Sequence, residues 1–368
     1  MLPALKNERP RLADVMPSCL AALGHETNRL ALPPVSKAIV VLVDGLGAAA
    51  LRARAGHART LAGAMGGASV IESGFPTTTA AALASLTTGT SAGTHGLVGY
   101  SVLDAANDRV VNQLSGWDDR LDPVAWQAQP TVFEQAPHAV AIGPARYATS
   151  GFTKAVLRGA RYLPAASIAE RFERAAAWLH EPGSGIAYVY VPELDSTGHA
   201  EGWESPAWTE KLELLEAAAV DLVRSLGKHD GLIVTADHGV IDIPHGSHVI
   251  FGAERELTDG LQHVAGEPRC LQLHTEPDAF EQLLAAWSES EGERSWVVSR
   301  AEAIEAGWFG EVLPEIEPRI GDILVAARKN IAYYASATDS GRGMVGQHGS
   351  WSPAELQVPL LRFGAFAR

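Results

Sequence analysis

Residues 40–45 read Val-Val-Leu-Val-Asp-Gly, an apolar run that ends directly in an aspartate and a glycine. Such a run, rich in β-branched side chains and closed by a turn signal, is typical of a strand buried on both faces of a parallel sheet. An aspartate before glycine is usually a turn former, so Asp44 by itself does not identify a site. The significance of the segment is that the same arrangement recurs along the chain.

Three further segments carry carboxylates or imidazoles at comparable positions. They are Asp195 and His199 after the apolar run 186–191, Asp237 and His238 after the apolar run 232–235, and His348 between Gln347 and Gly349. Each alone has an ordinary structural explanation, such as capping the next helix. In open α/β sheets, however, ligands bind beyond the carboxyl ends of the strands. Three aspartates and three histidines, counting Asp44, fit two divalent metal ions there.

A threonine-rich turn supplies a candidate nucleophile. Residues 75–79 read Phe-Pro-Thr-Thr-Thr and precede the helix-forming run 80–86, so Thr79 is predicted at the N-terminus of a helix. A threonine hydroxyl is a poor nucleophile near neutral pH unless a metal ion or a base activates it. Two cations can clamp a transferring phosphoryl group, and helix N–H groups add stabilisation of an anion.

Composition narrows the class of protein. At 368 residues the chain can form one large α/β domain with an insertion, and its formal net charge of −14 argues against a binder of nucleic-acid polymers. An anionic substrate would need local positive charge, which bound metal ions supply. The two cysteines cannot form a disulfide framework. No apolar run reaches membrane-spanning length, so we expect a cytoplasmic protein without membrane contact.

The order of elements predicts the fold class. Strand-like and helix-like runs alternate through most of the chain, which predicts a three-layer α/β/α fold around a mostly parallel sheet. Residues 97–135 are expected to be irregular. Residues 245–335 combine short strands with helices, and we predict that they form a small α+β cap inserted into a catalytic domain of residues 1–244 and 336–368.

Taken together, the segments resemble the alkaline phosphatase superfamily, and most closely its nucleotide pyrophosphatase/phosphodiesterase branch. The motifs that carry the resemblance follow in order: Val43-Asp44-Gly45, Pro76-x-x-Thr79, Thr88-Gly89, His95-Gly96, Asp195-x-x-x-His199, Asp237-His238-Gly239 and Gly346-x-His348-Gly349. Any one of them occurs by chance, but their joint presence in this order is specific. The resemblance implies an alkaline phosphatase-like fold.

The resemblance also implies a site with two Zn²⁺ ions, for which Mn²⁺ or Fe could substitute. One ion would be held by Asp44, Thr79, Asp237 and His238, and the other by Asp195, His199 and His348. Thr79 would be the nucleophile of a phosphodiester or pyrophosphate hydrolase that forms a phosphothreonine intermediate. Its partner would be a small phosphorylated substrate, such as a nucleotide or another phosphodiester.

The chain departs from this family at the phosphoryl contact. In the phosphodiesterase branch an Asn beyond the nucleophile holds a non-bridging phosphoryl oxygen, and Tyr100 stands at that position here. A Tyr hydroxyl can donate the same hydrogen bond. The sequence has no clear counterpart of the Arg with which alkaline phosphatases hold a monoester, which favours a diester. Tyr147, Arg158 and Arg269 are further candidates for substrate binding, with a solvated charged loop as the alternative.

Other functions and roles stay open at this point. A phosphomonoesterase or phosphonate hydrolase could use the same metals, and a degenerate metal-binding module could merely recognise a phosphorylated partner. The second is disfavoured because the nucleophile and all ligands are present. His95 is interpreted as a structural histidine, and His245 and His248 as the start of the cap. The cap is expected to cover the metal cleft and set the leaving-group preference, or alternatively to stabilise or dimerise the protein.

Overall fold

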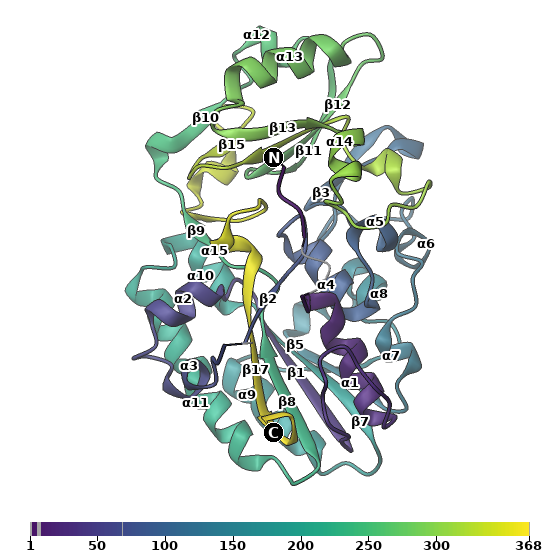
Figure 1. Cartoon of the computed structure of the whole chain (residues 1–368), viewed down its shortest axis with the longest axis vertical. Helices are drawn as coiled ribbons and strands as arrows, with labels where there is room; N and C mark the ends of the chain where they lie inside the picture. Colours follow the sequence, from purple (N-terminus) through teal and green to yellow (C-terminus); the bar gives the residue numbers. More distant parts are fainter. Residues whose placement is uncertain (1, 6–8, 68, 368) are drawn as a thin grey trace.

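The apolar residues 40–43 form the end of β1 (Lys37–Val43), whose seven residues are all buried. The computed structural model describes residues 2–5, 9–67 and 69–367. In it β1 lies at the centre of a seven-stranded sheet (Figure 1). The sheet order is β2 (Val70–Glu72), β17 (Gln357–Gly364), β8 (Asp230–Thr235), β1, β7 (Gly185–Val191), β5 (Ala139–Gly143) and β6 (Arg161–Pro164).

The pairing of the central strands aligns their carboxyl ends. β1 is parallel to both of its neighbours, with Val43 opposite Val191 of β7 and Leu42 opposite Thr235 of β8. The loops that follow these three strands therefore leave the sheet at the same edge. β5 and β6 continue the parallel arrangement, whereas β17 runs in the opposite direction and pairs antiparallel with both β8 and β2. The prediction of an α/β fold with a mostly parallel sheet is confirmed.

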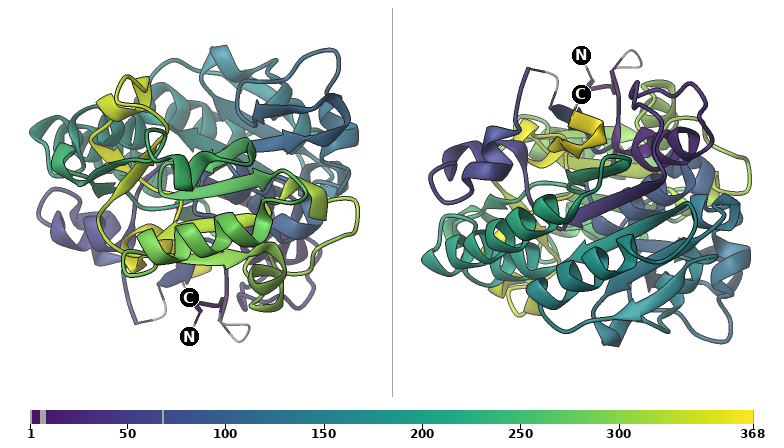
Figure 2. Two further views of the ribbon diagram at one scale, coloured as in Figure 1. Left: turned by 90° about the horizontal axis from the view of Figure 1, so that it is seen from above. Right: turned by 90° about the horizontal axis from the view of Figure 1, so that it is seen from below.

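Helices cover both faces of the sheet and make the three layers (Figure 2). One group comprises α1 (Val15–Leu23), α4 (Thr79–Thr88), α7 (Val132–Gln135) and α8 (Gly151–Val156). The other comprises α9 (Ile168–Leu179), α10 (Glu193–Glu201) and α11 (Pro206–Ser225), with α2 (Ala48–Ala53) and α3 (Arg59–Gly63) beside them. Within the described residues, none of the helices combines the length and apolar character needed to cross a bilayer.

A second sheet of six antiparallel strands stands above the carboxyl edge of the first (Figure 1). Its order is β13 (Ser295–Ser299), β14 (Ile323–Ala327), β12 (Cys270–Thr275), β11 (Leu261–Glu267), β3 (Ser101–Asp104) and β4 (Arg109–Asn112). The helices α12 (Arg255–Thr258), α13 (Phe280–Glu291) and α14 (Arg300–Glu305) accompany it.

This second sheet corrects one expectation and extends another. The expectation that residues 97–135 are irregular was wrong, because they contain β3, β4, α6 (Pro123–Trp126) and α7. The short helix α5 (Ala92–His95) ends just before this segment. Four-residue strands are too short to produce a clear alternation in the sequence. The predicted cap of residues 245–335 stays a prediction as a domain, and its sheet also recruits β3 and β4.

Short elements connect the two sheets. β9 (Ile241–Asp242) pairs with β16 (Gly346–Gln347), and β10 (His248–Ile250) pairs with β15 (Ala332–Tyr334), so the two ends of the inserted segment lie side by side. α15 (Pro353–Leu356) then leads into β17. Short 3-10 helices occupy Leu12–Asp14, Ala105–Asn107, Ala145–Tyr147, His245–Ser247, Glu317–Arg319, Ser340–Gly343 and Ala365–Ala367.

A buried ion pair fastens the second sheet to the first. Arg269, next to β12, donates from Nε and Nη2 to the carboxylate of Glu355 in α15, at 3.1 and 2.7 Å, and both side chains are fully buried. Its Nη1 donates to the backbone carbonyls of Lys329 and Ile331. The prediction that Arg269 binds substrate was wrong, because every one of these donors is already used inside the protein.

We expect Arg269→Ala to lower the free energy of unfolding by about 3–5 kcal/mol, because it leaves the Glu355 carboxylate buried without its partner. Chemical denaturation monitored by tryptophan fluorescence measures this change. Arg255→Ala, which removes an exposed ion pair with Asp259, is the matched control and should leave stability unchanged. Equal stabilities for the two variants would contradict a structural role for Arg269.

Candidate metal centre

Two clusters of carboxylates and imidazoles lie at the carboxyl edge of the main sheet. The inner cluster is Asp44, Asp237 and His238, and all three residues are buried. Asp44 follows β1 and the other two follow β8. His238 Nε2 lies 3.4 Å from Asp44 Oδ1 and 3.4 Å from Asp237 Oδ2, so the three ligand atoms face a common point.

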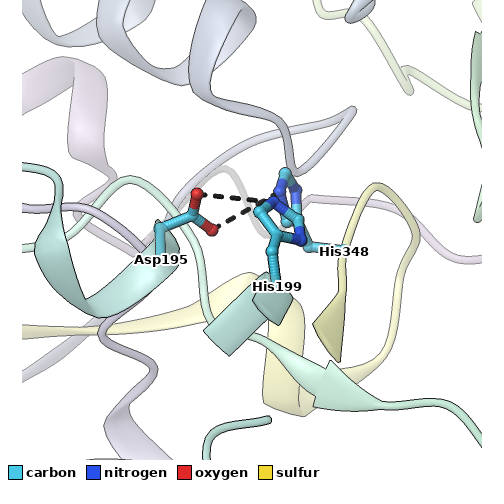
Figure 3. A group of neighbouring side chains, drawn as sticks. All are labelled: Asp195, His199 and His348. Carbon is cyan, nitrogen blue, oxygen red and sulfur yellow. Dashed lines mark ion pairs between the residues drawn. The ribbon is translucent and has the colours of Figure 1, made fainter. Parts of the chain in front are cut away.

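The outer cluster is Asp195, His199 and His348, and Figure 3 shows the three side chains converging. Asp195 and His199 are one turn apart on α10, which follows β7. His199 Nε2 lies 3.3 Å from Asp195 Oδ2, and His348 Nε2 lies 3.8 Å from Asp195 Oδ1. These residues are partly exposed, so the outer cluster is open to a ligand from solvent.

The histidines are held in the orientation that metal binding requires. In each ring Nδ1 lies within hydrogen-bond distance of a backbone carbonyl: Gly346 at 2.8 Å for His199, Thr77 at 2.8 Å for His348 and Gly239 at 3.3 Å for His238. When Nδ1 donates to that carbonyl, the lone pair of the neutral ring is on Nε2. A carbonyl that fixes the tautomer in this way is the usual support of a metal-ligating histidine.

The carboxylates each keep one oxygen free. Asp237 Oδ1 accepts hydrogen bonds from the N–H groups of Gly45 and His238, at 3.1 and 3.0 Å, and Asp44 Oδ2 accepts one from the Tyr190 hydroxyl. The remaining oxygens, Asp44 Oδ1, Asp237 Oδ2 and Asp195 Oδ1, are buried without a hydrogen-bond partner. A buried carboxylate oxygen without a partner is unfavourable, and a divalent cation in each cluster would satisfy these oxygens.

Burial and the neighbouring charges disfavour the ionised forms of the three side chains of the inner cluster. Burial, followed by repulsion from Asp237 and Asp195, raises the pKa of Asp44 well above its usual value. Burial and the charge of Asp195 raise the pKa of Asp237 to about 7. Burial, followed by the neighbouring His348 and His199, lowers the pKa of His238. A bound cation reverses this balance for the carboxylates and favours neutral imidazoles, so these donors fit a metal ion.

Thr79 lies where the two clusters meet. The rings of His238 and His348 stack with centroids 3.6 Å apart, and Thr79 Oγ1 is 3.1 Å from His238 Nε2. Thr79 is the first residue of α4, after the extended Thr78. The loops approach closely because Gly45 has a left-handed φ of 74°, and a Cβ there would lie 3.0 Å from the Asp195 Cα.

Two cavities open at this point. The tyrosine pocket has a volume of about 160 Å³, and its aromatic walls are Tyr147, Phe152, Tyr162, Tyr188 and Tyr190. The cap cleft has a volume of about 640 Å³ and extends between the two sheets; its polar walls include Thr78, Tyr100, His199, Glu267 and His348. Thr79 and Asp195 line both cavities. Among the residues that the structure describes, no Arg or Lys lines either one.

The structure brings together the residues predicted as metal ligands, and their role as ligands stays a prediction. Tyr147 lines the tyrosine pocket and the half-exposed Tyr100 lines the cap cleft. The prediction that Arg158 binds substrate was wrong, because its guanidinium donates to three backbone carbonyls and to Glu134. His95 is buried beside Ser85, as expected of a structural histidine.

Sequence reasoning missed two residues of the site. Tyr190 lies within β7, and its position in a strand-forming run gave no signal besides that of a core residue. Glu267 ends β11, a strand that the sequence analysis did not identify. Neither could be assigned from local pattern, because each meets its partner through the folded structure. His245 and His248, by contrast, are absent from both clusters in the described chain.

An α/β sheet that presents two Asp/His clusters and a helix-terminal threonine at its carboxyl edge defines a member of the alkaline phosphatase superfamily. Within it, the chain matches the type I phosphodiesterase / nucleotide pyrophosphatase family over residues 38–351 and belongs to that family. Members of this family are metal-dependent enzymes. No curated protein sequence matches the chain.

Solved structures agree with this fold. Murine ectonucleotide pyrophosphatase/phosphodiesterase 5 is 18% identical with a TM-score of 0.69, over 88% of this chain and 87% of that one. An inactive variant of the same protein, in complex with AMP, has the same identity and score over 90% and 88%. Phosphonoacetate hydrolase from Sinorhizobium meliloti, in complex with phosphonoacetate, is 17% identical with a TM-score of 0.68, over 90% and 91%. At these identities the likeness shows the fold.

We expect Tyr190→Phe to weaken the affinity for zinc by about 10–100-fold, because the hydroxyl that orients Asp44 is lost. Competition with a chromogenic chelator measures the affinity. Tyr162→Phe is the matched control, since Tyr162 lies in the same pocket but its hydroxyl donates to the carbonyl of Pro144 at 2.9 Å. If both variants bind zinc as the wild type does, Tyr190 does not support the metal site.

Proposed function

We propose that this chain hydrolyses small phosphodiesters or pyrophosphates with two zinc ions, and that Thr79 is the nucleophile. The observation that carries the proposal is the position of the Thr79 hydroxyl, 3.1 Å from His238 Nε2 at the junction of the two clusters. Imidazole and carboxylate donors suit zinc, although Mn²⁺ or Fe could bind the same set. Thr79, together with the inner cluster, would hold one ion, and the outer cluster would hold the other.

Bound in this way, the two ions would lower the pKa of the attacking hydroxyl and offset the charge that develops on the phosphoryl group. Thr79 Oγ1 attacks phosphorus, the bond from phosphorus to the leaving oxygen breaks, and a phosphothreonine forms. Water then cleaves the phosphothreonine and restores the hydroxyl. The N–H groups at the start of α4, whose first residue is Thr79, would stabilise the negative charge of the transferred group.

The cavities favour a diester over a monoester. A diester has two ester groups, and two cavities meet at Thr79, one for each group. A monoester carries one more negative charge, which enzymes commonly neutralise with Arg or Lys. No such side chain lines either cavity in the described part of the chain. We infer that the substrate phosphoryl group is a monoanion.

The side chains of the tyrosine pocket indicate which kind of ester group of the substrate it would bind. Its walls include five aromatic side chains, and planar groups such as nucleobases stack well on tyrosine rings. The complex of the murine relative with AMP supports a nucleotide-like substrate. The cap cleft would hold the second ester group, so the cap would set the preference for that group. A cytoplasmic location and the absence of a membrane partner stay predictions from the sequence.

A phosphonate hydrolase is the second candidate, supported by the likeness to phosphonoacetate hydrolase. Phosphonoacetate also carries a carboxylate, for which neither cavity provides an Arg or Lys among the described residues. Turnover of bis-p-nitrophenyl phosphate, p-nitrophenyl phosphate and phosphonoacetate by the zinc-loaded protein separates the diester, monoester and phosphonate functions. We expect the diester to give the highest kcat/KM.

We expect Thr79→Ala to reduce diester hydrolysis to near the background rate, because the attacking oxygen is removed, with metal content and melting temperature largely retained, because the six Asp and His donors of the two clusters remain. Thr79→Ser should keep measurable activity, since it retains a hydroxyl. Steady-state kinetics with bis-p-nitrophenyl phosphate measure both.

Two other threonines, Thr78 before α4 and Thr88 at its end, provide the controls. Thr88→Ala, at the opposite end of α4, should behave as the wild type, because the Thr88 hydroxyl bonds only within its own turn. Loss of activity in Thr78→Ala together with wild-type rates in Thr79→Ala would reject Thr79 as the nucleophile.

A further inference from the structure

Glu267 is a buried carboxyl group that belongs to neither metal cluster in the described chain. It is the last residue of β11, only 6% exposed, and it lines the cap cleft together with Thr79 and His348. Its side chain lies against the backbone of Gly349, where a Cβ would be 2.4 Å from Glu267 Cγ and 3.1 Å from Oε1. The second sheet therefore contributes one acidic side chain directly beside the metal-binding segment.

The two oxygens of this carboxyl group differ. Oε2 accepts a hydrogen bond of 2.9 Å from the Tyr100 N–H, and the Thr78 side chain also interacts with the carboxyl group. Oε1 is buried and has no hydrogen-bond partner within the protein. The Tyr100 N–H thus holds Oε2, while Oε1 lies beside Gly349 with its hydrogen-bonding capacity unused.

We propose that Glu267, in its neutral acid form, donates a hydrogen bond from Oε1 to a non-bridging oxygen of the phosphoryl group bound at Thr79. The proposal rests on the proposed function, because it assigns a contact to that substrate. An ionised carboxylate would repel the phosphoryl oxygens, whereas a neutral acid stabilises them without adding charge. It would be the cleft's donor to a monoanion in a cavity where the described residues include no Arg or Lys.

The surroundings of Glu267 favour the neutral form. Burial, together with the smaller effect of the nearby charge of Glu355, raises its pKa to about 8 against the opposing effects of the Tyr100 N–H and Thr78. The titratable and charged groups around the carboxyl group and across the cleft are Tyr100, Asp195, His199, Arg269, Cys270, Tyr333, Tyr334, Asp339, His348 and Glu355. Of these, Arg269 is already paired with Glu355. The donated proton is therefore present below this pKa and is lost as pH rises through it.

Two substitutions separate donation from packing. Glu267→Gln keeps an acceptor for the Tyr100 N–H and places an N–H₂ donor where Oε1 was, so kcat/KM for bis-p-nitrophenyl phosphate at pH 7 should stay within about threefold of wild type. Glu267→Met keeps the length but has no donor, so kcat/KM should fall by about 100-fold. Glu281→Gln, an exposed change on α13, is the matched control and should have no effect.

A pH series tests the role without relying on the disruptive variant. The ratio of kcat/KM for wild type to that for Glu267→Gln should fall by about tenfold or more between pH 7 and pH 9.5, because only the wild type loses its donor. Titrations that the two proteins share cancel in the ratio. A constant ratio, or a Gln variant as slow as the Met variant, would overturn the proposal, since a purely structural Glu267 predicts the first and an acceptor role predicts the second.

Binding of inorganic phosphate to the zinc-loaded proteins, measured by calorimetry, separates this inference from the proposed function. Glu267→Met should bind phosphate at least about tenfold more weakly than Glu267→Gln. If the wild type hydrolyses no diester but this difference is found, the proposed function fails and the role of Glu267 stands. If diesters are hydrolysed and the two variants bind phosphate equally, Glu267 does not contact the phosphoryl group.

Discussion

The site depends on three carboxylates held together at one edge of the sheet. Asp44, Asp195 and Asp237 each present a buried oxygen that no protein group satisfies. Burial and mutual repulsion disfavour the ionised forms of Asp44 and Asp237, as their raised pKa values indicate. A divalent cation in each cluster would offset this cost, and the surrounding structure has a matching form: imidazoles whose Nδ1 faces a backbone carbonyl, and a hydroxyl at the junction.

Most of this arrangement could be predicted from the sequence, for a physical reason. Adjacent parallel strands with aligned ends bring their following loops to one place, so residues far apart in the chain become neighbours whenever each follows a buried strand. The apolar runs before Asp44, Asp195 and Asp237 can be recognised in the sequence as buried strands. Thr79 was identifiable because the Ala-rich run after it forms α4. His348 was counted among the candidate ligands from its position, but its assignment to the same ion as Asp195 and His199 came from the resemblance of the whole motif set to a family.

The remainder depends on contacts that no local pattern encodes. The strands β3 and β4 are four residues long and pair with each other, and β3 joins the second sheet through β11, more than a hundred residues later. Arg158 and Arg269 looked like substrate ligands because they are cationic, yet each uses its donors on backbone carbonyls and a carboxylate inside the fold. Glu267 was overlooked for the converse reason, since an acidic residue is not an obvious partner for phosphate until its burial and its unpartnered oxygen are known.

We propose that two metal ions bound at the edge of the first sheet flank Thr79, and that Glu267 of the second sheet donates a hydrogen bond to the same phosphoryl group. Anomalous diffraction from crystals of the zinc-loaded protein, collected on both sides of the zinc absorption edge, tests it most directly. We expect two peaks in the anomalous difference map. One should lie among Asp44, Asp237 and His238, next to Thr79 Oγ1, and the other among Asp195, His199 and His348. A single peak, or peaks only at residues outside these clusters, would contradict it.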